Sequence, residues 1–165
     1  MTEVTRSEKA EMLRNSVLAV ELTGDQCNVL ADVITVHDFT DGEIIVGEGK
    51  TDNRLQVIVN GAIAVSKFNQ ATKEWINLYV LTRGDLVGEL AFMDSKPHYA
   101  ALRAMGVTRT LSLEREGLES LLDREPWIVY RVMRAIFRVV HGLLHRMGAQ
   151  QAELTSYIYR AQAKY

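Results

Sequence analysis

The feature that most constrains the fold is a change in hydrophobic rhythm near residue 36. Before this point, apolar residues recur at three- and four-residue intervals, which indicates amphipathic helices. From about Val36 to Leu113 the pattern changes to short β-prone runs separated by glycine, asparagine and aspartate. Many short strands without intervening helices favour an antiparallel β sandwich or a small jelly-roll barrel over a parallel sheet.

The β-prone region contains six runs that we interpret as strands. They are residues 44–46, 55–59, 62–65, 76–81, 100–104 and 110–113. Asn60–Gly61 separates the second run from the third. This dipeptide predicts a tight hairpin, because both residues tolerate the positive φ that a type I′ turn requires.

Helical patterns flank the β-prone region on both sides. Residues 7–36 predict two short helices with a break at Thr23–Gly24–Asp25, where Thr23 or Asp25 would cap the second helix. After Arg115 a short helix is expected around residues 118–122. Pro126 then restarts the chain at the beginning of a long helix that reaches about Gln162.

The long C-terminal helix carries an apolar stripe that is wider than a small barrel needs. Its members step by three and four: Val129, Val132, Ile136, Val139 and Leu143, widened by Met133, Val140, Leu144 and Met147. Two interpretations remain open. The stripe packs onto the barrel of its own chain, or it forms a coiled-coil-like seam between two copies.

Composition excludes several classes of protein. The chain has 165 residues, 47% of them apolar, which suits one domain with a real core. Its net charge of -2 provides no basic field for nucleic acid, and about twenty residues after Leu144 leave no room for a helix-turn-helix module. The single Cys27 forms no internal disulfide. With no signal peptide and no membrane span, a soluble cytoplasmic protein is expected.

The segment from Gly84 to Ala104 carries the clearest functional pattern. Gly84 and Gly88 allow sharp bends between a strand and a short helical turn, and the first amides of such a turn attract an anion. Glu89 in the same turn is unusual beside a bare anion. Its carboxylate makes sense if it accepts a hydrogen bond from a ligand hydroxyl, such as a ribose 2′-OH.

Gly88–Glu89–Leu90–Ala91–Phe92–Met93, followed by Pro97 and a strand that closes on Ala104, resembles the phosphate-binding cassette of the cyclic-nucleotide-binding domain family. The earlier patterns Phe39-x-x-Gly42-Glu43, Gly47-Glu48-Gly49 and Leu81-x-x-Gly84-Asp85 resemble the family in the same order. The resemblance covers about residues 16–144. It implies an eight-stranded antiparallel β jelly-roll barrel, flanked by N-terminal helices and by a long C-terminal helix that closes the pocket or dimerises.

The resemblance also implies roles for the cassette residues. Glu89 would hold a ribose hydroxyl and the backbone near Leu90 and Ala91 would meet phosphate oxygens. The implied ligand-binding set is Gly88, Glu89, Leu90, Ala91, His98, Tyr99 and Ala100. Two positions depart from the family. His98 replaces an arginine whose guanidinium is permanently charged, and Tyr99 brings a ring to a position that is usually small, where it either points away or fills the pocket.

We therefore expect one domain: helices in residues 1–35, the β core in 36–115, and lid or dimer helices in 116–165. No catalytic motif is present and we expect no enzyme. No cofactor is expected, and cAMP or cGMP is the candidate ligand. His141 and His145 share a helix face, but neither they nor His37 supply a complete set of metal ligands.

Two functions follow from this interpretation of the sequence. In the first, the chain is a small-molecule sensor that relays ligand binding through the long helix to a second copy or a protein partner. In the second, it is a structural interaction module that has kept the barrel and lost the cyclic nucleotide, or takes a different small ligand. Neither includes direct nucleic-acid or membrane binding.

Overall fold

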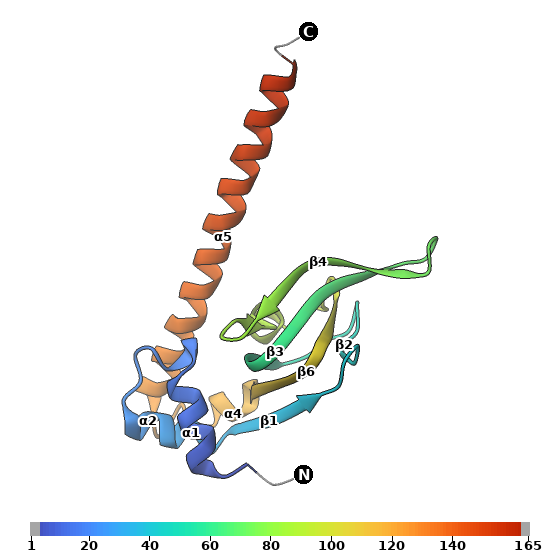
Figure 1. Cartoon of the computed structure of the whole chain (residues 1–165). Coiled ribbons are helices and arrows are strands. Elements are labelled where there is room, and N and C mark those ends of the chain that lie inside the picture. The colour runs from blue at the N-terminus through green and yellow to red at the C-terminus, as the bar shows by residue number, and fades with distance from the viewer. Residues whose placement is uncertain (1–3, 163–165) are drawn as a thin grey trace.

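Two long antiparallel strands, β3 (Arg54–Asn69) and β6 (Ala101–Glu114), form the centre of the fold (Figure 1). The computed structural model describes residues 4–162. The sheet order is β1-β6-β3-β4, with β2 paired to β6 and β5 paired to β3. The other bounds are β1 Ile34–Phe39, β2 Ile44–Val46, β4 Glu74–Thr82 and β5 Leu86–Val87. The predicted antiparallel architecture with flanking helices is confirmed. The described residues form six strands in an open sheet, whereas the resemblance implied an eight-stranded barrel.

The hairpin predicted at Asn60–Gly61 is wrong, because the chain continues through this dipeptide as one strand. Both halves of β3 pair with β6, and the register shifts on either side of Asn60. Gly61 has φ +81° and lies so close to β6 that a Cβ there would be 2.6 Å from the Val107 carbonyl oxygen. Glycine is therefore required at this position by a bulge in a continuous strand, and not by a turn. The hairpin between β3 and β4 forms further on, between Asn69 and Glu74.

The N-terminal helices begin at capping boxes that satisfy the free amides of the first turn. α1 (Arg6–Arg14) is capped by Thr5, and α2 (Gly24–Ala31) is capped by Thr23, one of the two predicted caps. A short 3-10 turn, η1 (Val17–Ala19), connects them. The sequence pattern predicted helix up to residue 36, but residues 34–36 lie in β1. Pairing with β6 overrides the local helical spacing there.

The main core lies between the outer face of the sheet and the helices. Its fully buried large members are Leu13, Leu18, Leu30, Ile34, Leu55, Leu111, Leu113, Leu121, Ile128 and Ile136. α4 (Arg115–Glu119) leads from β6 toward α5 (Pro126–Gln162), which begins at the predicted proline. Figure 1 shows α1, α2 and the first turns of α5 gathered at one end of the sheet.

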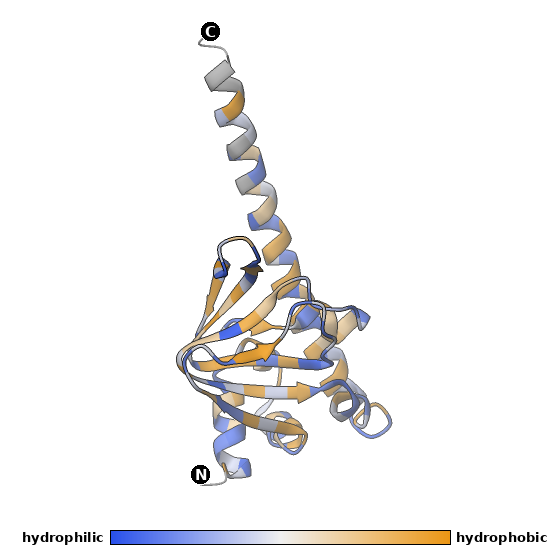
Figure 2. Ribbon diagram, turned by 90° about the vertical axis from the view of Figure 1, so that its right-hand side faces the viewer, coloured by the Kyte–Doolittle hydropathy of each residue, from blue (hydrophilic) through white to orange (hydrophobic). Residues whose placement is uncertain are grey.

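α5 divides into a packed part and a projecting part. Val132, Ala135 and Ile136 are buried in the main core, which matches the first of the two predicted uses of the stripe. Further along, Leu144 is 62% exposed, and hydrophobic residues recur along the helix beyond the sheet (Figure 2). No helix within residues 4–162 combines the length and the apolar character that a membrane span requires.

Candidate functional site

The cassette begins where β5 ends at Val87 and α3 (Glu89–Asp94) starts. Gly88 joins them with φ +83°, a conformation that side chains disfavour. A Cβ on Gly88 would lie 2.8 Å from the Arg54 carbonyl oxygen, so close approach to β3 also requires glycine. The structure therefore supports the importance of Gly88 in shaping this turn, for reasons of backbone geometry.

α3 is held by Arg115, a residue that the sequence analysis did not identify. Its Nε donates to the Phe92 carbonyl at 2.7 Å, and its Nη2 donates to the Ala91 carbonyl at 2.9 Å. These carbonyls belong to the last turns of α3, where a cation is favourable. Ala91 and Phe92 are themselves buried. Arg115 thus fixes the cassette helix to the end of β6.

Glu89 is partly buried at the start of α3. Burial raises the pKa of its carboxyl above the usual range, because a charged carboxylate loses hydration there. Within residues 4–162, this carboxylate accepts a hydrogen bond from its own backbone amide and from no other residue. Its charge also contributes, as the smallest of four causes, to the raised pKa of Tyr79. Leu90, the next residue, is 54% exposed.

His98 lies where the resemblance placed a charged partner. Its backbone is fixed by hydrogen bonds from His98 N to the Lys50 carbonyl at 2.8 Å and from Gly49 N to the His98 carbonyl at 2.7 Å. Its Nε2 is buried without a hydrogen-bond partner. Burial lowers the pKa of the imidazole, an effect that the nearby charge of Asp52 opposes. The ring is therefore neutral at neutral pH and adds no fixed charge.

Tyr99 is 56% exposed, and its hydroxyl lies 2.8 Å from the hydroxyl of Tyr79 on β4. This bond connects the end of the cassette to the β4 edge of the sheet. Burial, and then the hydrogen bond with Tyr99, hold the pKa of Tyr79 well above its ordinary value. Ala100 is buried in a second apolar cluster with Val87 and Leu102. No sequence signal predicted the Tyr79–Tyr99 pair.

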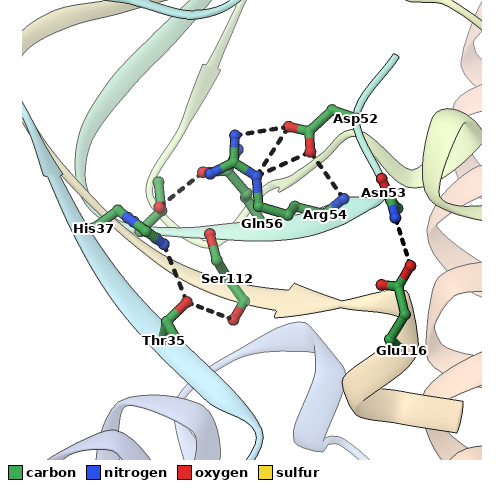
Figure 3. A network of polar contacts seen from close by, with 9 residues as sticks. Thr35, His37, Asp52, Asn53, Arg54, Gln56, Ser112 and Glu116 are labelled. Atoms are coloured by element: carbon green, nitrogen blue, oxygen red, sulfur yellow. Dashed lines mark hydrogen bonds and ion pairs between the residues drawn. The ribbon is translucent and has the colours of Figure 1, made fainter.

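We call the face of the sheet that points away from the helices its inner face. Near the helices, this inner face is polar (Figure 3). Thr110 Oγ1 donates to Gln56 Oε1 at 2.9 Å, and both residues are almost fully buried. Ser112, on the same strand as Thr110, has a buried Oγ without a partner. Arg54 and Asp52 form an ion pair above this polar face, with Nε 2.9 Å from Oδ1. The sequence pattern did not predict this network, because polar residues in a strand are ordinarily expected to face solvent.

The two cations that flank the cassette in sequence are occupied elsewhere. Lys96 Nζ lies 3.2 Å from Asp94 Oδ2 on the surface. Arg103 places its guanidinium 4.9 Å from the ring centre of Trp75, with its Nε buried and unpaired. Arg103 is therefore not a freely exposed surface charge.

Two other features lie away from the cassette. His141 and His145 have ring centres 4.9 Å apart on α5, and no group of three metal-type ligands occurs within the described residues. A hollow of about 420 Å³ lies between α1 and residues 57–59 of β3. None of the residues that line this hollow belongs to the set from Gly88 to Ala100.

Known proteins share parts of this sequence and this fold. The family model described as "Cyclic nucleotide-binding domain" matches residues 36–125. The cAMP-dependent protein kinase regulatory subunit of Emericella nidulans is 32% identical over 93 residues, covering 56% of this chain and 22% of that protein. The CRP-like cAMP-activated global transcriptional regulator of Mycobacterium tuberculosis is 26% identical over 101 residues, covering 61% of this chain and 45% of that protein.

Among solved structures, a cyclic nucleotide-binding domain from Methylobacillus flagellatus KT superimposes with a TM-score of 0.72. It is 19% identical and the match covers 86% of this chain and 79% of that one, which establishes the shared fold. The chain spans less than half the length of the curated relatives it matches. The family model covers more than half of the chain, and its range includes the cassette. The chain belongs to the cyclic nucleotide-binding domain family.

Proposed function

We propose that this chain is a non-catalytic, cytoplasmic regulatory domain that binds a cyclic nucleotide at its cassette and relays occupancy through α5. In this proposal residues 1–165 act as one domain, with helices in 1–35, the ligand-binding sheet in 36–115 and the relay helices in 116–165. Gly88, Glu89, Leu90, Ala91, His98, Tyr99 and Ala100 surround the ligand. Two of the similar proteins, a transcriptional regulator and a kinase regulatory subunit, have names that include cAMP.

The observation that carries the proposal is the state of Glu89. The partly buried Glu89 carboxylate accepts no hydrogen bond from another described residue, so it is free to accept one from a ligand. A ribose hydroxyl can donate that hydrogen bond. Gly88 allows the chain to bend immediately before Glu89, and Arg115 fixes the helix that carries it. In this proposal, the Glu89 carboxylate is the hydrogen-bond acceptor that recognises the ligand hydroxyl.

α5 offers a route for the signal to a second copy of the chain. Its packed part contacts the main core, whereas four exposed residues recur at multiples of seven along one face. They are Tyr130 at 51%, Phe137 at 69%, Leu144 at 62% and Ile158 at 48% exposure. Heptad spacing of exposed apolar residues is typical of a helix seam between two chains. We infer a homodimer, which size-exclusion chromatography with light scattering tests directly: a monomer, or a dimer unchanged by Leu144→Glu, would contradict it.

Calorimetric titration with cAMP and with cGMP tests the ligand. The wild-type chain is expected to bind at least one of them. Glu89→Gln is expected to weaken binding by about tenfold or more, because it removes a hydrogen bond to a charged acceptor. Glu119→Gln is the matched control, since Glu119 is exposed on α4. Absence of binding, or equal effects of the two substitutions, would refute the proposal.

The second candidate function is an interaction module that binds no cyclic nucleotide. The neutral His98 and the Tyr79–Tyr99 bond across the edge of the site favour it. Titration of His98→Arg and Tyr99→Ala separates the two functions. Tight binding by either variant, with none by the wild type, indicates a pocket disabled at that position. Absence of binding by wild type and variants supports the interaction module.

A further inference from the structure

The Arg54–Asp52 ion pair lies on the inner face of the sheet and is largely withdrawn from water. Arg54 Nε donates to Asp52 Oδ1 at 2.9 Å and Nη2 donates to Oδ2 at 3.0 Å. The two side chains are 29% and 11% exposed. Since Leu55 packs into the outer core, strand alternation directs Arg54 and Gln56 to the inner face. A charged pair thus lies at the start of β3, beside the polar residues Gln56 and Thr110.

The pair is next to the cassette. β3 and β5 pair with Gln56 opposite Val87, which brings the backbone of Arg54 close to Gly88 at the start of the cassette. The Arg54 carbonyl is the nearest atom to a Cβ built on Gly88, and the His98 ring lies 3.9 Å from the same point. The charge of Asp52 acts on His98 as well as on Arg54. Asp52 therefore neighbours both the guanidinium and the imidazole.

Three other cations near the cassette are engaged elsewhere in the described part of the chain. Arg115 donates to carbonyls of α3, and Arg103 stacks on Trp75. Lys96 is on the surface with Asp94. His98 is neutral at neutral pH. Among these groups, Arg54 alone combines permanent charge with a position on the inner face beside the cassette.

We propose that Arg54 supplies the positive charge for the anionic group of the ligand, in place of the arginine that His98 replaces, and that Asp52 competes with the ligand for it. This inference rests on the proposed function. A guanidinium binds a phosphate or a carboxylate through the same planar fork. An entering cyclic phosphate exchanges for Asp52, whose carboxylate then faces His98. Asp52 thereby weakens binding, and Arg54 makes binding possible.

Calorimetric titration with cAMP, repeated with cGMP, tests this exchange. Asp52→Asn is expected to tighten binding by about tenfold or more, because it removes the competing charge. Arg54→Gln is expected to abolish binding. Asp38→Asn and Arg109→Gln are matched controls, because Asp38 and Arg109 form a similar pair between β1 and β6 with more exposed side chains. Neither control is expected to change affinity.

The double variant Asp52→Asn/Arg54→Gln guards against misfolding, because removing both charges avoids leaving one of them buried and unpaired. We expect it to fold with wild-type thermal stability and to bind neither nucleotide. If the wild type binds and the double variant binds equally well, the role of Arg54 is refuted while the proposed function stands. If only Asp52→Asn binds, the role of Arg54 is supported and cyclic-nucleotide sensing by the natural chain is refuted. If neither the wild type nor Asp52→Asn binds, both fail.

Discussion

Gly61 provides the most direct test of how the two long strands are held together. It lies in the bulge of β3 with φ +81°, where β3 crosses close to β6. A Cβ added there would meet Thr108 Oγ1 at 2.5 Å, the Val107 carbonyl oxygen at 2.6 Å and Thr108 Cα at 2.7 Å. Two of these atoms belong to the backbone of a central strand. They cannot move aside as the end of a flexible side chain does.

Gly61→Ala therefore combines two costs. A side chain in the left-handed region costs about 1–2 kcal/mol. Forcing an extra carbon into packed structure adds about 1–3 kcal/mol, for a total of roughly 2–5 kcal/mol. Gly106 is the matched control, because it has φ +70° in β6 and nothing lies within 4 Å of its added Cβ. Gly106→Ala should lose only the conformational part, about 1–2 kcal/mol.

Urea unfolding followed by circular dichroism measures both variants against the wild type. The expected result is a lower unfolding midpoint for both, with a larger loss for Gly61→Ala at an unchanged slope. The difference between the two free energies isolates the close approach of β3 to β6. Equal losses for the two variants would show that β6 yields at no cost, and would refute the reasoning.

Three further predictions concern single side chains. Val132→Ala should cost about 1–3 kcal/mol in chemical unfolding, whereas Leu144→Ala, on the projecting part of α5, should change stability by less than about 0.5 kcal/mol. Because burial raises the pKa of Glu89, its contribution to stability is lost as pH rises from about 4.5 through the folded pKa; Glu89→Gln should therefore be more stable than wild type at pH 7 and lose that advantage below pH 4.5. Burial lowers the pKa of His37, so stability is retained above about pH 6.5 and lost as pH falls through the folded pKa; His37→Gln should reduce the difference between unfolding midpoints at pH 7 and pH 5.

Features that depend on neighbours in sequence were predictable. Thr23 caps α2 because its hydroxyl reaches an amide three residues later, and Pro126 begins α5 because a first helical turn needs no amide donor. Gly88 adopts positive φ at the connection from β5 to α3, and Gly84 adopts it in the turn between β4 and β5. The family resemblance depended on such short local motifs and on their order along the chain. The match of the family model to residues 36–125 confirms it.

Features that depend on distant partners were not predictable from local pattern. Asn60–Gly61 has the composition of a hairpin, but pairing of both halves of β3 with β6 keeps the strand continuous. The sequence around Arg103 does not show that Trp75, on another strand, lies against its guanidinium. The Tyr79–Tyr99 bond joins residues 20 apart with no motif between them. In each case a contact between separate strands decides the role, and local spacing carries no information about that contact.

The proton on His98 distinguishes the two possible sources of positive charge in the site. Because its pKa is lowered, His98 gains charge only on acidification, whereas Arg54 is charged throughout. Glu89 also takes up a proton more readily than usual, so affinity at a single pH mixes two effects. The ratio of the wild-type affinity to that of His98→Gln removes the contribution of Glu89, which both proteins share. If Arg54 holds the anion, this ratio stays constant for cAMP between pH 7.5 and pH 6; a ratio that grows on acidification would assign the charge to His98.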